Sequence, residues 1–232
     1  MKYTFPTMGT MVSLEVDHPI ELPVLIAGFD RYDETFSLYR PDSELSRVAS
    51  GGLALTEASA MLRDAYSAAI DWRSVTAGAF TPNRPDGVVD LDGIVKALAI
   101  EEAGQLLGPS RWCLNVGGDV LVSGDGWTVG VVDPDDRGAL LCSFRLGAPR
   151  RAIATSGISE RGEHVWGRAD DFAQVTVIAD DIVTADVLAT AILADGAAFR
   201  DTASTRWPVD LATVTRDGRI EMTPGARATL AS

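Results

Sequence analysis

Acidic, basic and glycine residues between 88 and 96 have the spacing that phosphate and metal chemistry requires. Asp90 and Asp92 follow an apolar pair, and Gly93 admits close approach of other atoms where an apolar, alanine-rich segment begins. A carboxylate and free backbone carbonyls beside a helix start can hold a hard cation, and Lys96, one turn later, can contact a phosphate oxygen. A structural alternative stays open, in which Asp92 caps the helix and Lys96 is a solvated surface charge.

A second pair of oxygen-bearing side chains, Asp186 and Thr190, is spaced by four residues. On a helix this spacing places both side chains on one face, one turn apart. They could supply two oxygen ligands to Mg²⁺, which fills its remaining positions with water and substrate phosphate. In the alternative, Thr184 caps the helix, Thr190 packs in the core, and Asp186 is a first-turn acid that the helix dipole favours.

Three glycine-containing stretches could bring bare backbone close to a ligand. Met8-Gly9-Thr10 indicates a turn, and Gly117-Gly118 inside a strand-like run indicates a bulge or a surface for a flat or anionic group. Thr155-Ser156-Gly157 predicts a hydroxyl-rich turn whose N–H groups suit phosphate. Two side chains have open roles, because Tyr39 either packs beside a turn or binds a ligand, and His164 is either structural or a general base.

Hydrophobic periodicity predicts the elements that position these residues. Apolar residues at helical spacing predict helices, and alternating or β-branched runs predict strands. The predicted helices cover 20–32, a segment that Thr56 caps and that ends near 76, a short helix that Asp42 or Ser43 caps, 94–107, and a segment from Thr184 through 193. The predicted strands cover 11–16, 112–116, 120–122, 127–132, 140–146, 152–155 and 172–179, with a hairpin over 209–215 and 219–222.

Composition limits the classes of function. The 232 residues are 46% hydrophobic, enough for a full core in one domain or in two closely packed lobes. The net charge of −13, with 33 acidic and 20 basic residues, makes nucleic acid and anionic membrane unsuitable partners. Cys113 and Cys142 lie in apolar strand-like runs, which predicts reduced core residues of a cytoplasmic protein. No apolar run reaches the length of a membrane span, and nothing supports export.

Taken together, these motifs resemble those of the ApbE family, which comprises FAD:protein FMN transferases, also called flavin transferases. The resemblance runs from Met8 to about Leu193, and the motifs occur in the family's order. They are Met8-Gly9-Thr10, Phe36-Ser37-Leu38-Tyr39 with Ser43-Glu44-Leu45-Ser46, Asp90-Leu91-Asp92-Gly93-Ile94-Val95-Lys96, Asn115-Val116-Gly117-Gly118-Asp119, Thr155-Ser156-Gly157 and Ala185-Asp186-Val187-Leu188-Ala189-Thr190.

The resemblance implies a magnesium-dependent enzyme that splits the pyrophosphate of FAD, transfers FMN to a threonine or serine hydroxyl of a target protein and releases AMP. Mg²⁺ and Lys96 would neutralise charge on the pyrophosphate, and His164 would take the proton of the attacking hydroxyl. The implied metal ligands are Asp186, Thr190, a backbone oxygen near Gly93 and the Ala189 carbonyl. The implied FAD site comprises Met8, Gly9, Thr10, Tyr39, Ala79, Phe80, Thr81, Asp90 and Lys96, with Gly117, Gly118, Thr155, Ser156 and Gly157 close to it.

The resemblance also implies an α+β fold, with mixed sheets and packed helices in two closely associated lobes and the flavin nucleotide between them. We expect one ApbE-like domain over residues 1–232. The chain differs from the family pattern in the run after His164 and in Phe80-Thr81-Pro82-Asn83. The connection from there to Asp90 is also shorter than is typical, and Leu98 stands near the family's glycine after the lysine. Three alternatives to transfer therefore stay open: an FAD-binding protein, an FAD pyrophosphate hydrolase with water as acceptor, and a magnesium-free structural protein.

Overall fold

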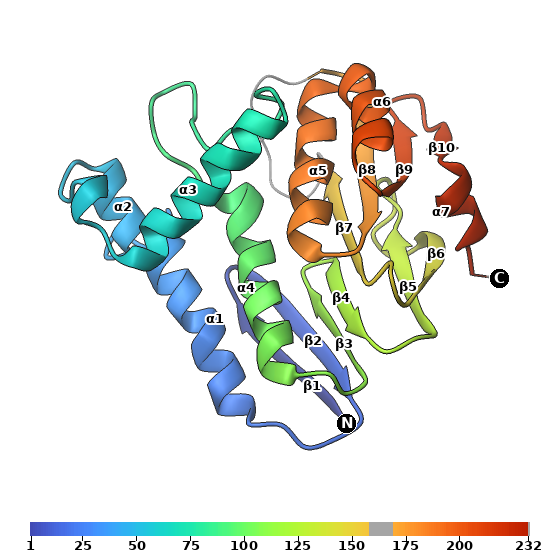
Figure 1. Ribbon diagram of the computed structural model, residues 1–232, viewed down its shortest axis with the longest axis horizontal. Coiled ribbons are helices and arrows are strands. Elements are labelled where there is room, and N and C mark those ends of the chain that lie inside the picture. Colours follow the sequence, from blue (N-terminus) through green and yellow to red (C-terminus); the bar gives the residue numbers. More distant parts are fainter. Residues whose placement is uncertain (158–168, 232) are drawn as a thin grey trace.

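A large antiparallel sheet forms the centre of the molecule (Figure 1). The computed structural model describes residues 1–157 and 169–231, and within them eight strands pair edge to edge. In spatial order these are β1 (Lys2–Thr7), β2 (Thr10–Val16), β3 (Trp112–Val116), β4 (Asp119–Ser123), β7 (Ala152–Gly157), β8 (Phe172–Ala179), β9 (Asp210–Thr215) and β10 (Ile220–Met222). All neighbouring pairs in this described sheet are antiparallel.

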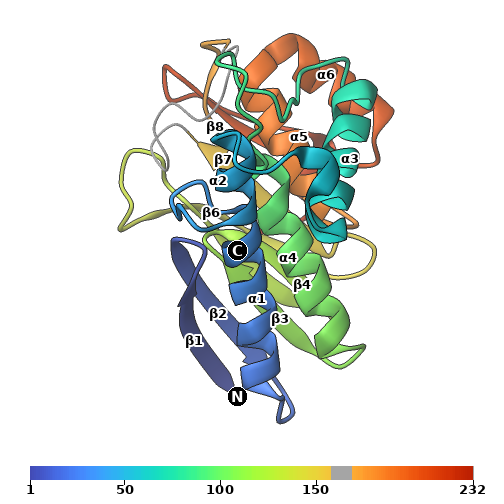
Figure 2. The same cartoon turned by 90° about the vertical axis from the view of Figure 1, so that its left-hand side faces the viewer.

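Helices cover one face of the sheet, and a small hairpin covers the other. Helices α4 (Asp92–Leu107) and α5 (Ile182–Asp195) pack against the helix-covered face of the sheet, and they also contact each other. Figure 2 shows α4 to the right of β1 and β2. The remaining helices are α1 (Leu22–Phe36), α2 (Glu44–Ala49), α3 (Ala60–Val75), α6 (Ala197–Arg206) and α7 (Pro224–Ala228), with a 3₁₀ turn at Leu55–Glu57. The hairpin of β5 (Trp127–Val132) and β6 (Leu140–Leu146) packs on the opposite face with α7.

The alternation of side chains along the strands separates two hydrophobic cores. On β4, Leu121 belongs to the core under the helices, whereas Val120 and Val122 belong to the core under the hairpin. On β7, Ala154 faces the helices and Ile153 faces the hairpin. This two-residue period is what a sheet buried on both faces requires. It also means that Asp119 and Ser156, in phase with Leu121 and Ala154, are directed to the helical side.

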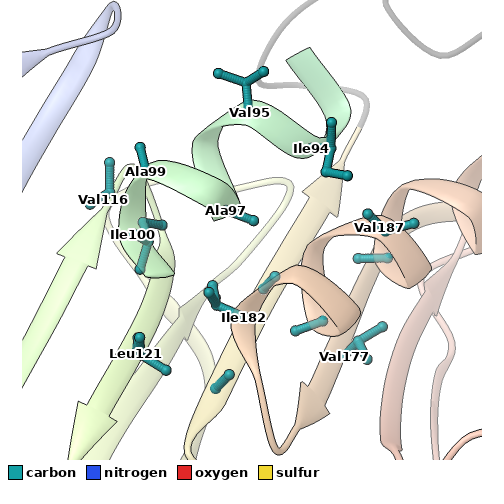
Figure 3. Close-up of a cluster of buried hydrophobic side chains, with 14 of the residues drawn as sticks. Ile94, Val95, Ala97, Ala99, Ile100, Val116, Leu121, Val177, Ile182 and Val187 are labelled. Carbon is teal, nitrogen blue, oxygen red and sulfur yellow. The ribbon is translucent and has the colours of Figure 1, made fainter. Parts of the chain in front are cut away.

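The helix α5 is the most enclosed of the helices that carry predicted site residues. Ten of its 14 residues are buried, so it is in contact with protein on nearly all sides. Figure 3 shows Ile182 and Val187 of α5 in one cluster with Ile100 of α4, Leu121 of β4 and Val177 of β8. Each fully buried isoleucine or valine of this kind contributes roughly 1.5–3 kcal/mol. The Asp186 and Thr190 side chains therefore extend from a firmly packed support.

The predicted α+β class is confirmed, and most predicted elements match a helix or strand of the structure. Four elements were not predicted, namely β1, α6, α7 and the 3₁₀ turn at Leu55–Glu57. The single domain over residues 1–232 stays a prediction. Among the described residues, no helix combines the length and apolar character needed to cross a membrane.

The predicted cap at Thr56 is wrong, and so is the alternative in which Thr184 caps α5. Helix α3 begins after Ser59, whose hydroxyl accepts the Leu62 N–H at 3.2 Å, whereas Thr56 lies in the preceding 3₁₀ turn. Helix α5 begins after Asp181, whose carboxylate accepts the Thr184 N–H at 2.7 Å. In both cases the observed cap lies three positions from the residue considered in the sequence analysis. Both residues are polar and could accept a hydrogen bond from the free N–H groups, so the sequence alone does not choose between them.

Candidate functional site

A cavity of about 580 Å³ lies between the β1–β2 turn, the end of α1 and the start of α4. Ligand pockets in proteins commonly have a volume of this order. Four residues of the predicted FAD site line the cavity: Met8, Gly9, Tyr39 and Lys96. The other residues of the lining, within the described part of the chain, are Tyr32, Asp33, Phe36, Ser37, Arg40, Asp92 and Val95.

The β1–β2 turn supplies one wall of this cavity. Thr7 pairs with Thr10, so Met8 and Gly9 form a two-residue hairpin turn. Both have positive φ, +44° at Met8 and +69° at Gly9, as the tightest hairpin turns require. A methionine in this conformation costs on the order of 1 kcal/mol that glycine would avoid. The strained position brings the Met8 side chain to the cavity wall.

The turn that follows α1 supplies the rim. The buried Ser43 hydroxyl donates to the Ser37 carbonyl at 2.6 Å and accepts the Ser46 N–H at 3.0 Å, which closes the turn and caps α2. Tyr39 lies in this turn with 76% of its surface exposed. The large aromatic ring thus lies at the cavity rim and not in the core.

Charged groups on the α1 side bind one another. The Arg40 guanidinium contacts Asp42 at 3.4 Å and Asp33 at 3.3 Å, and hydrogen bonds to these carboxylates raise the pKa of Arg40 above its usual value. Burial, reinforced by Glu102, raises the pKa of Tyr32 well above that of an exposed tyrosine. Its hydroxyl donates to Glu102 at 3.2 Å. Tyr32 therefore stays neutral and fixed on the cavity wall.

The start of α4 supplies the opposite wall. The Asp90 carboxylate accepts the Asp92 N–H at 3.0 Å, and the Asp90 N–H donates to the Pro82 carbonyl at 2.8 Å. Leu91, whose side chain cannot accept a hydrogen bond, occupies the N-cap position, so capping by Asp92 is wrong. Asp92 is instead the first helical residue and lines the cavity together with Lys96, one turn later.

Lys96 connects the cavity to the sheet. Its ammonium forms an ion pair with Asp119 of β4, and the two side chains are only 12% and 1% exposed. The second Asp119 oxygen accepts the Thr155 N–H of β7 at 3.1 Å. Lys96 is therefore no solvated surface charge, and that structural alternative is wrong. A cation fixed at a partly dehydrated wall suits an anionic ligand.

Oxygen atoms from α5 and β7 gather beside the first turn of α4. The hydroxyls of Ser156 and Thr190 lie 3.3 Å apart. A methyl group added to Gly93 would lie 3.5 Å from the Thr190 methyl carbon and 2.9 Å from the Phe80 ring, so α4 and α5 touch at this point. Asp186, one turn before Thr190, is 5% exposed. Thr190 of α5 therefore lies beside Gly93 of α4, and a joint role of Asp186, Thr190 and Gly93 in holding a metal stays a prediction.

The chemical types of these side chains fit a hard divalent cation. Asp186 carries a carboxylate, and Ser156 and Thr190 carry hydroxyls; Mg²⁺ prefers such oxygen donors and supplements them with water and phosphate. Within residues 1–157 and 169–231, no group of three or more His, Cys, Asp or Glu side chains gathers. Among the described residues, these oxygen-bearing side chains suit Mg²⁺ better than zinc, whose sites typically use histidine and cysteine. A metal site at this point stays a prediction.

A family model covers most of this chain. The model of the ApbE family matches residues 8–86 and 81–209, which include the turn at Met8, the cavity wall at Lys96 and the oxygen cluster at Thr190. The chain belongs to the ApbE family.

Solved structures of ApbE proteins share the fold. The ApbE protein of Thermotoga maritima has a TM-score of 0.82 at 20% identity, with 100% of this chain covering 99% of that one. The flavin transferase ApbE of Vibrio cholerae has a TM-score of 0.80 at 20% identity, with 99% of each chain covered. The flavinyl transferase ApbE of Pseudomonas stutzeri, in its apo form, has a TM-score of 0.77 at 17% identity, with 100% and 97% covered. No curated protein matches the chain.

Other predicted residues of the ApbE pattern lie outside the large cavity. Gly118, Thr155 and Gly157 line a small hollow of about 40 Å³ beside the end of β5. Thr10 packs against Gly117, where an added methyl group would lie 2.5 Å from the Thr10 hydroxyl oxygen. This contact joins the β1–β2 and β3–β4 turns. A ligand role for these residues stays a prediction.

Two local predictions within the ApbE motifs are corrected by the structure. Thr155-Ser156-Gly157 is no turn, because it ends strand β7 and pairs with β8 in register. Gly117-Gly118 is no bulge, because Val116 pairs with Asp119 and the glycines, with φ of +61° and +101°, form a two-residue hairpin turn. The tight turn places Asp119 at the first position of β4.

The remaining predicted residues lie near the oxygen cluster or outside the described part of the chain. Ala79 and Thr81 flank the buried Phe80, which touches Gly93. Ala189 is fully buried inside α5. The predicted general base, His164, lies outside the described residues.

Sequence reasoning missed several residues of this site. Asp119 belongs to a quoted motif but received no role, although an acid that opens an apolar strand run was a usable signal. Tyr32, Asp33 and Arg40 gave no comparable signal, since they read as ordinary helix and turn residues.

Proposed function

We propose that this protein transfers FMN from FAD to a threonine or serine hydroxyl of a target protein in a Mg²⁺-dependent reaction that releases AMP. The observation that carries the proposal is one helical turn of α4. Lys96 lies in the wall of a nucleotide-sized cavity, and Gly93, three residues earlier, packs against Thr190 of α5. Membership of the ApbE family and the fold shared with proteins named flavin transferases support the same reaction.

Each group has a distinct role in the proposed site. Asp186 and Thr190, with backbone oxygens near Gly93 and at Ala189, would hold Mg²⁺, and Ser156 orients the Thr190 hydroxyl. Bound Mg²⁺ would supply Lewis acidity at a phosphate oxygen. The FAD site proper would be formed by the cavity, with the Tyr39 ring at its rim available to stack on a flat ring system.

The proposed step is a phosphoryl-type transfer. The acceptor oxygen attacks the phosphorus on the FMN side of the pyrophosphate, and the bond from that phosphorus to the bridging oxygen breaks. AMP leaves with the bridging oxygen, and the acceptor proton passes to a base, for which we propose His164. The Lys96 ammonium offsets negative charge that grows on the leaving phosphate.

The test compares the wild type with Asp186→Asn, a change that keeps the side-chain shape. Protein, FAD, Mg²⁺ and a pool of threonine- or serine-containing peptides are incubated, and peptide mass is followed. We expect a mass gain of one FMN in the wild type and a loss of at least about 100-fold in Asp186→Asn, because the metal loses its carboxylate. Asp195→Asn, at the exposed end of the same helix, is the matched control and should keep full activity.

The same experiment separates the alternative functions. Release of AMP without an FMN-bearing peptide would identify a pyrophosphate hydrolase, and FAD that stays intact would identify a binding protein. Titration with Mn²⁺ as a spectroscopic probe tests the metal site apart from activity. Equal Mn²⁺ affinity in the wild type and Asp186→Asn would show that the metal assignment is wrong. A cytoplasmic location and a protein acceptor belong to this proposal as well.

A further inference from the structure

Lysine is rare in this chain, and one of its lysines is buried at the cavity. Lys2 and Lys96 are the two lysines among 20 basic residues. The Lys2 side chain is 78% exposed on edge strand β1, whereas the Lys96 side chain is 12% exposed. Lysine presents a compact ammonium, whereas arginine presents a broad, flat guanidinium. The cavity wall thus uses a compact cation in a chain whose other cations are almost all arginines.

Asp119 holds that ammonium from the side of the sheet. One carboxylate oxygen forms the ion pair with Lys96, and the other accepts the Thr155 N–H at 3.1 Å. The Gly117-Gly118 turn fixes the start of β4, and strand alternation directs Asp119 toward α4. Three elements, α4, β4 and β7, therefore determine where the ammonium lies.

The carboxylate can act on a ligand only through the lysine. Lys96 is among the described residues that line the cavity, and the fully buried Asp119 is not. Desolvating two charges is costly, and apolar residues of similar size often stabilise a fold as well as a buried ion pair does. The Lys96–Asp119 ion pair is therefore expected to add little to stability, but it fixes the position of the Lys96 charge before a ligand binds.

We propose that Asp119 is a positioning residue that holds the Lys96 ammonium in place to neutralise the pyrophosphate of the bound dinucleotide. The inference rests on the proposed function, since it names the residue that makes Lys96 effective in that same site.

A double-mutant cycle tests the proposal. The proteins are the wild type, Asp119→Asn, Lys96→Gln and the double variant, and FAD cleavage is measured as kcat and KM. We expect Asp119→Asn to lower kcat/KM for FAD by roughly tenfold or more, since it removes a charge-assisted contact. In the Lys96→Gln background it should have almost no further effect, because its target is gone. Equal losses in both backgrounds would show that Asp119 acts independently of Lys96 and would overturn the proposal.

A stability control accompanies the cycle. Asp210→Asn breaks the Arg150–Asp210 contact of 2.9 Å, which is partly buried and belongs to the far side of the sheet. We expect it to lower the melting temperature without changing KM for FAD. If Asp119→Asn does not fold, the double variant is compared with Lys96→Gln instead, because the double variant carries no unpaired buried charge. A further loss of FAD affinity in that comparison would count against the proposal.

Amine labelling supplies a readout that needs no activity. With two lysines and the N-terminus as the amines of the chain, peptide mass spectrometry can follow Lys96 with Lys2 as internal reference. We expect slow labelling of Lys96 in the wild type, further protection by FAD, and labelling several-fold faster in Asp119→Asn. If the wild type binds FAD but does not cleave it, the proposed function fails and this labelling still decides the inference. Unchanged labelling in Asp119→Asn, or no protection by FAD, would overturn it.

Discussion

Replacing Gly93 by alanine places a methyl group at the contact between α4 and α5. The added carbon would lie 2.9 Å from the Phe80 ring carbon Cε2 and 3.5 Å from the Thr190 methyl carbon. The first distance is too short for two carbon atoms, and Phe80 is 3% exposed, so the ring has little room to move. Either the ring or the start of α4 therefore shifts.

Two opposing effects set the magnitude. Alanine favours a helix over glycine by up to about 1 kcal/mol, and less in the first turn. Overpacking a tight core site costs roughly 1–3 kcal/mol. The cost of the clash exceeds the gain in helix propensity, so we expect the free energy of unfolding to fall by about 1 kcal/mol. This loss lowers Tm by about 2–4 °C for a chain of this size. A shift of α4 relative to Thr190 should also weaken Mn²⁺ binding by about tenfold.

Gly104→Ala is the matched control. Its methyl group would lie 2.9 Å from the Leu121 side chain and 3.1 Å from Trp112, near the other end of α4. Both variants should lose stability in thermal unfolding, but Gly104→Ala should bind Mn²⁺ like the wild type. Unchanged stability and unchanged Mn²⁺ affinity in Gly93→Ala would refute the reasoning, because the close contact would then not constrain the site.

Two further predictions concern stability. Ser43→Ala removes both the α2 cap and the hydrogen bond to Ser37, so we expect a loss of about 1–2 kcal/mol in urea unfolding, and a change below a few tenths would contradict the assigned role. Burial raises the pKa of Cys113 from 9.0 to about 11, so the folded state keeps the thiol neutral while the unfolded chain ionises. This contribution is fully present below pH 9.0 and is lost as the pH rises to about 11. The stability difference between the wild type and Cys113→Ser should change across that window, and parallel curves would disprove the linkage.

Elements with strong periodicity could be predicted from the sequence, and those governed by context could not. The runs at 94–107 and 172–179 are rich in apolar residues; the first forms most of α4, and the second is β8. β1 was missed because Pro6 argues against a strand, and an edge strand tolerates the missing N–H. α6 was missed because it buries only Phe199 and Ala203, too few for a helical stripe.

For the site, spacing could be predicted and docking could not. Asp186 and Thr190 are one turn apart on any helix, so their shared face followed from the sequence. Whether Tyr32 and Asp33 face solvent or a cavity depends on how α1 packs against β1 and α4, which a single helix does not encode. The ion pair of Lys96 and Asp119 joins residues of two elements whose relative position only the folded sheet fixes.

The enclosure of α5 separates a fixed half of the site from an adaptable half. Freeing this helix would expose much of the core, so its side chains move apart only when the whole domain opens. The Tyr39 side chain at the rim is largely exposed, so it can change its rotamer without disturbing the core. We therefore expect differences in ligand size to be accommodated at the rim, while Asp186 and Thr190 keep one arrangement with and without a ligand.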